Sequence, residues 1–197
     1  SQGYKAGGVA LFECSAPYDP ETVDAFEIGY KARLGAGSTT LTAALFSYDY
    51  SDFQVAQVIG LASVTRNAGD AEVLGFELEF SSYLTDRWLL SGGMTLLDTQ
   101  YGDFINFDGL NPAAGFQNLK GNALNDAPET SINLGVQYSM PAFAGELSVR
   151  VDTAYRSRVY FREFGARDDS QSGYAVINVN AGWKSNDGVW EGGLFAK

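Results

Sequence analysis

Apolar and polar residues alternate along most of the chain, and this period of two is the feature that most limits its possible folds. Between residues 22 and 34, Phe26 and Ile28 fall on one face of an extended chain, whereas Glu27 falls on the other. The same pattern recurs in residues 73–82, 130–139, 146–156 and 174–184. Because successive side chains of a strand point to opposite faces, each stretch predicts a strand with one apolar and one polar face.

Three further stretches are extended in character but alternate less cleanly. They are residues 39–58, 88–101 and 189–197. Leucines fall on both faces of residues 88–97, so the pattern does not assign the faces of that strand. Together the stretches predict about eight strands of ordinary length, and none of them fits the period of a helix.

The connections between these strands alternate between short and long. Tight turns are expected at residues 35–38, 85–87, 141–145 and 185–188. Looser or longer links are expected at residues 60–63, 102–126 and 163–172. Outer-membrane barrels have short periplasmic turns and long extracellular loops, whereas a soluble meander has no reason to alternate in this way. The sequence therefore predicts an all-β fold, an antiparallel transmembrane β-barrel with its longer links on the outside.

Composition excludes several other classes of protein. The sequence contains no run of about 18 apolar residues, so it predicts no transmembrane helix. It also contains no histidine, which excludes a Ser-His-Asp triad and a histidine-ligated zinc site. No carboxylate pair stands out either, so we predict no enzyme activity, metal site or cofactor. A net charge of −11 argues against a nucleic-acid surface, which needs clustered basic residues.

Aromatic residues gather near the predicted turns and loops. Beside the short turns lie Tyr83, Trp88, Tyr138, Phe143, Trp183 and Trp190. Beside the longer loops lie Tyr101, Tyr160 and Tyr174. Amphipathic rings favour the headgroup level of a bilayer, so these positions predict two aromatic girdles. The alternative interpretation is that Tyr and Trp are simply common in strands.

Several segments resemble, in family order, motifs of the TonB-dependent receptors. They are GYKAGG at residues 3–8, PETVDAFEIGYK at 20–31, FSYDYSDFQ at 46–54, NAG followed by GFELE within 67–79, and NDAPE at 125–129. The Pro-Glu…Glu-x-Gly and Gly-x-Glu-x-Glu pieces are fairly specific when they occur together. The resemblance covers nearly the whole chain.

The resemblance implies a barrel of about 22 strands with a plug domain inside it, in the outer membrane of a Gram-negative bacterium. Its implied function is uptake of a scarce nutrient, most often an iron–siderophore complex, energised from the inner membrane through TonB. Residues 1–197 would be a partial barrel domain, without the plug domain, the coupling motif or the last strand. The implied partners are membrane lipid and lipopolysaccharide, TonB through the plug region, and a ferric siderophore or similar small ligand.

Two sets of residues are candidate functional sites. The longest loop would face outside and contact a ligand through Asp103, Phe104, Asn106, Phe107, Asp108, Phe116 and Asn118. The competing interpretation is a solvated loop whose phenylalanines pack on one another. Lumen-facing charges are expected at Glu77, Glu79, Arg150, Asp152 and Arg156. The arginines either favour an anionic ferric chelate or pair with carboxylates across the lumen or on the plug.

Two other functions remain open from the sequence. The chain could be a complete small outer-membrane barrel with a structural or adhesion role, which requires residues 189–197 to pair with 1–10 or 23–34. It could instead be a soluble β-sandwich or a carboxylate-dependent enzyme. In that case Leu74, Phe76 and Leu78 would form part of a buried core.

Overall fold

The computed structural model describes residues 1–10, 13–59 and 62–197, and its main element is one nine-stranded antiparallel sheet. In sheet order the strands are β1 (Gln2–Lys5), β4 (Glu21–Leu34), β5 (Thr39–Ser51), β8 (Ala71–Tyr83), β9 (Trp88–Tyr101), β12 (Thr130–Ala142), β13 (Gly145–Arg156), β16 (Tyr174–Ser185) and β17 (Glu191–Ala196). The predicted all-β, antiparallel fold is therefore confirmed. The described helices are short 3-10 turns, and none of them is long and apolar enough to cross a membrane.

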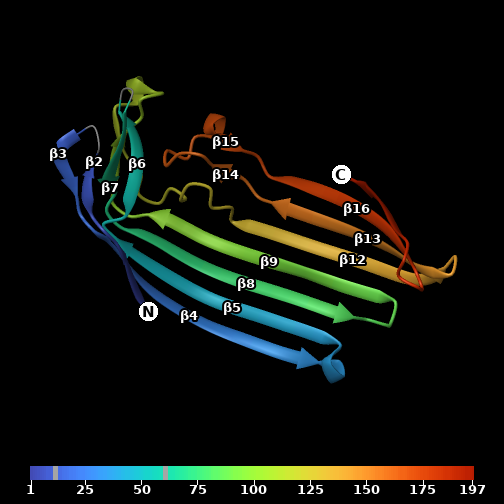
Figure 1. Cartoon of the computed structure of the whole chain (residues 1–197). Helices are drawn as coiled ribbons and strands as arrows, with labels where there is room; N and C mark the ends of the chain where they lie inside the picture. Colours follow the sequence, from blue (N-terminus) through green and yellow to red (C-terminus); the bar gives the residue numbers. More distant parts are fainter. Residues whose placement is uncertain (11–12, 60–61) are drawn as a thin grey trace.

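The remaining strands form four hairpins, each inserted in a long connection of the sheet. They are β2 (Gly8–Ala10) with β3 (Glu13–Tyr18), β6 (Gln54–Ile59) with β7 (Ala62–Asn67), β10 (Ile105–Phe107) with β11 (Phe116–Asn118), and β14 (Val159–Tyr160) with β15 (Ser170–Gln171). Figure 1 shows these connections gathered at one end of the sheet, on the left, and the short turns at the other end. The predicted alternation of short and long links is confirmed.

Two strand boundaries differ from the predicted ones. Residues 2–5 form a ninth strand because they pair antiparallel with the beginning of β4. The strand predicted over residues 39–58 is broken at Asp52, whose φ of 55° takes the backbone into the left-handed region. The chain therefore leaves the sheet after Ser51 and forms the β6–β7 hairpin. The link predicted at residues 60–63 includes Gly60 and Leu61, which lie outside the described residues.

The register of the sheet assigns every strand a polar and an apolar face. Glu77 of β8 lies opposite Ala44 and Thr95, and Thr95 lies opposite Ser131, so one face carries the polar residues of successive strands. On β9 the register places Leu89 and Leu97 on this polar face. It places Leu90, Met94 and Leu96 on the apolar face. Pairing with β8 and β12 thus assigns the two faces of β9, which its own sequence pattern does not assign.

The apolar face is open to its surroundings in the described chain. Phe26 is 69% exposed, and Ile28 and Leu74 are also more than half exposed. A soluble sandwich would bury these side chains against a second sheet, whereas the described residues place no second sheet over them. An exposed apolar surface of this extent needs a nonpolar environment to cover it.

At the short-turn end the register agrees with the predicted girdle for three rings but not for Tyr83, which lies opposite Leu89 on the polar face, and at the loop end the girdle prediction is wrong. At the short-turn end, Trp88, Tyr138 and Trp183 share the apolar face, and the rings of Trp88 and Tyr138 lie 4.6 Å apart. At the loop end, the register places Tyr101 and Tyr174 on the polar face. Position beside a loop does not determine which side of the sheet a ring faces, because the two sides alternate at every residue.

The tight contact between Gly75 and Phe46 makes a specific prediction about packing on the polar face. A Cβ at Gly75 would lie 2.1 Å from the Phe46 ring, so Gly75→Ala forces that ring to move. We expect a loss of about 1–3 kcal/mol in unfolding free energy, as for other overpacked sites. The control is Gly29→Ala on the same face, where the nearest atom lies 3.8 Å away. Equal melting temperatures of the two variants would contradict the prediction.

Candidate functional site

A pocket of about 700 Å³ opens on the polar face at the end of the sheet where the long connections gather. That volume is in the range of small-molecule sites. Its walls come from β4, β5, β8 and β9, from the beginning of the β6–β7 hairpin and from the segment before β12. The residues that matter most for its chemistry are Glu27, Phe46, Tyr48, Tyr50, Phe53, Glu77, Thr95, Thr99, Tyr101 and Asp126.

Aromatic rings in two contacting groups, Phe46 with Tyr48 and Tyr50 with Phe53 and Tyr101, form an aromatic wall of this pocket. On β5, the rings of Phe46 and Tyr48 stack with their centroids 5.0 Å apart and their planes 24° from parallel. Tyr50 meets Phe53 edge to face at 5.3 Å, and Phe53 in turn lies 6.2 Å from Tyr101. Offset and edge-to-face pairs are the favoured geometries of aromatic rings, so the wall is held in place by its own contacts.

Hydrogen bonds anchor the loop wall of the pocket to β9 and the hairpin wall to the connection between β1 and β4. The Thr99 hydroxyl accepts a bond from the Leu124 N–H at 3.1 Å, and the Tyr101 hydroxyl donates to Asn125 Oδ1 at 3.2 Å. Gln54 is buried, and its amide donates to the carbonyl oxygens of Ala6 and Asp19 at 3.1 Å each. The pocket is therefore built by segments that are distant in sequence.

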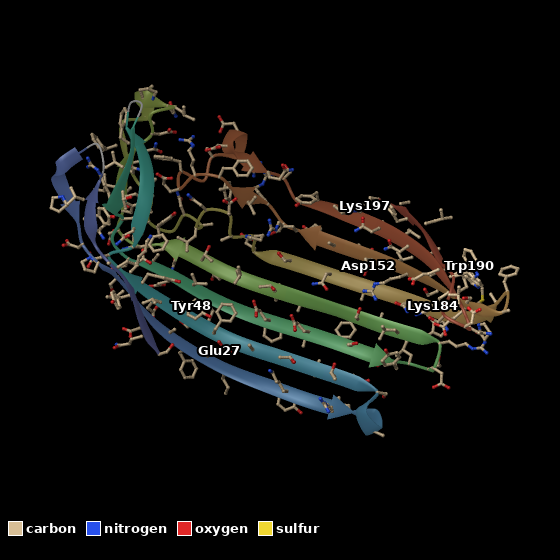
Figure 2. The ribbon with its side chains drawn as sticks, viewed as in Figure 1. Glu27, Tyr48, Asp152, Lys184, Trp190 and Lys197 are labelled. Atoms are coloured by element: carbon tan, nitrogen blue, oxygen red, sulfur yellow. The ribbon has the colours of Figure 1, made fainter. Side chains whose placement is uncertain are left out.

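The charges that line the pocket are all negative among the described residues. Glu27 comes from β4, Glu77 from β8 and Asp126 from the segment before β12. Figure 2 shows Glu27 and Tyr48 on the neighbouring strands β4 and β5. Carboxylates beside electron-rich ring faces create a region of negative potential, which favours cationic groups over anionic ones.

The charges predicted to face the lumen share the polar face of the sheet. The register places Glu77 and Glu79 of β8 on the same side as Arg150, Asp152 and Arg156 of β13. Arg150 and Asp152 form an ion pair, with Nη2 and Oδ1 2.6 Å apart, and Arg150 also donates to Ser91 at 3.2 Å. Arg150 is thus paired with a carboxylate of its own strand, and pairing across a lumen or with a plug stays a prediction. That the face borders a lumen stays a prediction.

The longest loop folds around a small hydrophobic core. Phe104 is 5% exposed and packs with Val55, Ala68, Tyr101 and Leu119. Partly buried side chains from three segments surround this cluster: Phe53, Leu124 and Phe164. The loop is therefore a folded unit attached to the β6–β7 hairpin and to the next long connection, not a freely solvated segment.

An interloop network of polar side chains joins residues 102–129 to residues 157–173. It consists of Asn106, Asp108, Arg162, Glu163 and Asp169. Arg162 Nη1 lies 2.6 Å from Asp108 Oδ1, and Arg162 Nε donates to Asp169. The Asn106 amide donates to Glu163 Oε1 at 2.6 Å, with both side chains buried. The Arg162 guanidinium also lies over the Phe164 ring, 5.3 Å from its centroid.

The network lowers the pKa of the Asp108 carboxyl below its ordinary value. Burial acts in the opposite direction and raises this pKa, but hydrogen bonds from Arg162 and from the Leu110 N–H, together with the Arg162 charge, outweigh it. The carboxylate is therefore ionised at neutral pH, and it holds the guanidinium of the neighbouring loop.

The structure divides the predicted ligand-contact residues into two groups. Phe104, Asn106 and Asp108 are buried and form contacts inside the loop cluster. Asp103, Phe107, Phe116 and Asn118 are exposed. Phe107 and Phe116 form a ring pair 5.6 Å apart on the β10–β11 hairpin, as the competing interpretation expects. Ligand contact by the exposed group stays a prediction.

Sequence reasoning missed the aromatic pocket, although a signal for it is present. Phe46, Tyr48 and Tyr50 occur at alternate positions, so any strand through them places all three rings on one face. The phase of this triplet matches the polar face only once β5 is paired with β4 and β8. The part contributed by Tyr101 and the segment before β12 has no local signal.

The chain matches the family model for the β-barrel of TonB-dependent-receptor-like proteins over residues 1–195. It is 30% identical over 146 residues to the probable TonB-dependent siderophore receptor PiuA of Acinetobacter baumannii, covering 72% of this chain and 18% of that protein. It is also 30% identical over 141 residues to the probable TonB-dependent receptor BfrD of Bordetella pertussis, covering 72% and 17%. The chain thus spans less than a fifth of each of these relatives.

Solved structures show the same fold. The ferric yersiniabactin uptake receptor FyuA of Yersinia pestis superposes with a TM-score of 0.74 at 21% identity, over 95% of this chain and 27% of that one. The siderophore receptor PiuA of Acinetobacter baumannii superposes with a TM-score of 0.67 at 25% identity, over 86% and 23%.

Replacing Arg162 is expected to separate the two long connections. Arg162→Ala leaves the buried Asp108 carboxylate without its cation, which we expect to cost about 2 kcal/mol of local stability. The control is Lys120→Ala, because the Lys120–Asp103 pair is 62% and 74% exposed and such pairs contribute little. Hydrogen exchange of the two connections measures the difference. Unchanged protection in Arg162→Ala would contradict the role given to the network.

The lowered pKa of Asp108 also predicts how the network responds to pH. A depressed pKa stabilises the folded state above the unfolded value of about 3.9, and this stabilisation disappears as pH falls through the folded value. We therefore expect a constant interloop distance from about pH 5 to 8 and separation only below about pH 4. Spin labels at the exposed Leu110 and Asp168, with Cys14 replaced, would report this distance. Separation already near pH 6 would contradict it.

Proposed function

Because the chain belongs to the TonB-dependent receptors, we propose that the protein carrying it takes up an iron–siderophore complex across a bacterial outer membrane. The curated relatives include a probable siderophore receptor, which supports this class of nutrient. The proposal extends to energy supplied from the inner membrane through TonB, which is the general mode of the family. This chain contributes barrel wall and part of the outer recognition surface.

The observation that carries the proposal is the two-sided sheet with all of its long connections at one end. Its apolar face is exposed, as a lipid-facing surface must be. Its polar face contains the pocket, and that pocket opens where the long connections gather. In an outer-membrane receptor this end faces outward, so a ligand arriving from outside meets the loops first and the pocket next.

The open sheet favours a large barrel over the alternative of a complete small one. The order of the strands is linear, with β1 and β17 at opposite edges, and the described residues contain no pairing between them. The small barrel requires that pairing, which removes both edges. A larger barrel supplies further strands at these edges, as the length of the relatives allows.

Uptake is tested in a strain that lacks the gene and grows under iron limitation. We expect the gene encoding this chain to restore growth on a ferric siderophore, and we expect this rescue to disappear when TonB is also deleted. A non-chelated iron source serves as the control for general growth. Rescue that persists without TonB would overturn the energised mechanism, and absence of rescue on every siderophore class would overturn the uptake function.

The exposed phenylalanine pair tests the outer recognition surface. In the intact receptor, we expect Phe107→Ala with Phe116→Ala to weaken siderophore binding by roughly ten-fold, since buried aromatic contacts contribute about 1 kcal/mol or more each. Leu110→Ala is the control, because Leu110 is 79% exposed on the same connection but is not a predicted contact. Titration calorimetry measures the affinities, and equal values for both variants would remove the pair from the site.

A further inference from the structure

We propose that the polar-face pocket selects a ferric chelate that is neutral or carries a cationic group, and that it disfavours polyanionic chelates. This inference rests on the proposed uptake function and adds the charge class of the ligand. The pocket is defined by Glu27, Glu77 and Asp126 together with the aromatic wall from Phe46 to Tyr101. The volume of the pocket suits a small molecule, and its rings and carboxylates favour a neutral or cationic one.

The aromatic wall provides flat, electron-rich surfaces inside a cavity of ligand size. Phe46 and Tyr48 stack, and Tyr50, Phe53 and Tyr101 continue the surface. Cations are attracted to ring faces within about 6 Å, and neutral amide or aryl groups stack on the same faces. A wall of this kind therefore accepts neutral and cationic groups, and it gives no compensation for buried negative charge.

The carboxylates add selection by charge. Glu27 and Glu77 are placed by β4 and β8, the two strands on either side of β5, and the register puts both on the polar face with Phe46. An ammonium group resting on the β5 rings thus lies between two acidic side chains. A trianionic chelate in the same place would meet like charges, which raise its free energy.

No lysine or arginine is among the described residues that line the aromatic pocket. Arg150 is paired with Asp152, Arg162 with Asp108 and Asp169, and Arg158 donates to Ser170 at 2.6 Å. Arg156 lines a neighbouring pocket of about 420 Å³ with Phe161 and Tyr174, and Asp126 lies between the two pockets. None of these arginines lines the aromatic pocket, so its carboxylates are not neutralised from within its own wall.

The experiment compares three ferric chelates on the intact receptor in detergent. The first is a trihydroxamate with a free terminal amine, which is singly cationic when loaded with iron. The second is the same chelate with its amine acetylated, which is neutral and nearly identical in shape. The third is a tris-catecholate, which is polyanionic. Titration calorimetry at low and high salt gives the affinities, and we expect the order cationic, neutral, anionic at low salt.

Two variants test whether the carboxylates of the pocket cause the preference for a cationic chelate. We expect Glu27→Gln with Glu77→Gln to weaken binding of the cationic chelate by roughly five-fold or more and to leave the neutral chelate unchanged. The control is Glu79→Gln, which removes a carboxylate from the same face of β8 but outside the pocket. It should alter neither affinity.

Each outcome has a distinct meaning. Tightest binding of the anionic chelate would overturn the charge preference while supporting uptake of ferric chelates. An equal effect of the double variant on the cationic and neutral chelates would also overturn the preference. So would a lowered melting temperature with unchanged affinities, because the carboxylates would then pair with a basic segment of the receptor itself. If no chelate binds or supports growth, the proposed function fails together with the inference.

Discussion

The antiparallel ladder from β4 to β17 is the constraint on which every other feature depends. Its register fixes one polar and one apolar face across strands that lie as far apart in sequence as Phe26 and Ile177. A shift of one residue in any pair would exchange the two faces of that strand. In a lipid environment such a shift would expose charged groups such as Glu77 and Arg150 to lipid, which adds a further cost to any change of register.

The described chain places its buried hydrophobic cluster in the connections and leaves the apolar face of the sheet exposed. Val55 comes from the connection between β5 and β8, whereas Phe104 and Leu119 come from the connection between β9 and β12, and all three pack with Tyr101 at the end of β9. The interloop network around Arg162 then joins the next connection to the same body. These contacts give the long connections a defined shape, and under the proposed function a defined shape lowers the entropic cost of binding a ligand.

The pocket lies between the folded long connections and the polar face of the sheet. Its aromatic rings come from β5, from β9 and from Phe53 between β5 and β6, and hydrogen bonds at Thr99 and Tyr101 hold the segment before β12 against it. Arg150 and Arg162 form ion pairs outside the pocket, whereas the carboxylates of Glu27 and Glu77 line it. Under the proposed charge preference, ligand selection depends on which charges line the cavity and not on the number of basic residues in the chain.

The sequence by itself determined the class of fold, the alternation of short and long links, the faces of most strands and the family. These features are local, because a period of two or a turn motif is complete within about a dozen residues. Only the tertiary structure decided the faces of β9, the position of Tyr101 on the polar face, the burial of Phe104 and the pairing of Asp108 with Arg162. Each of these depends on a partner far away in the chain, and no local pattern specifies which distant segments the register and the packing bring together.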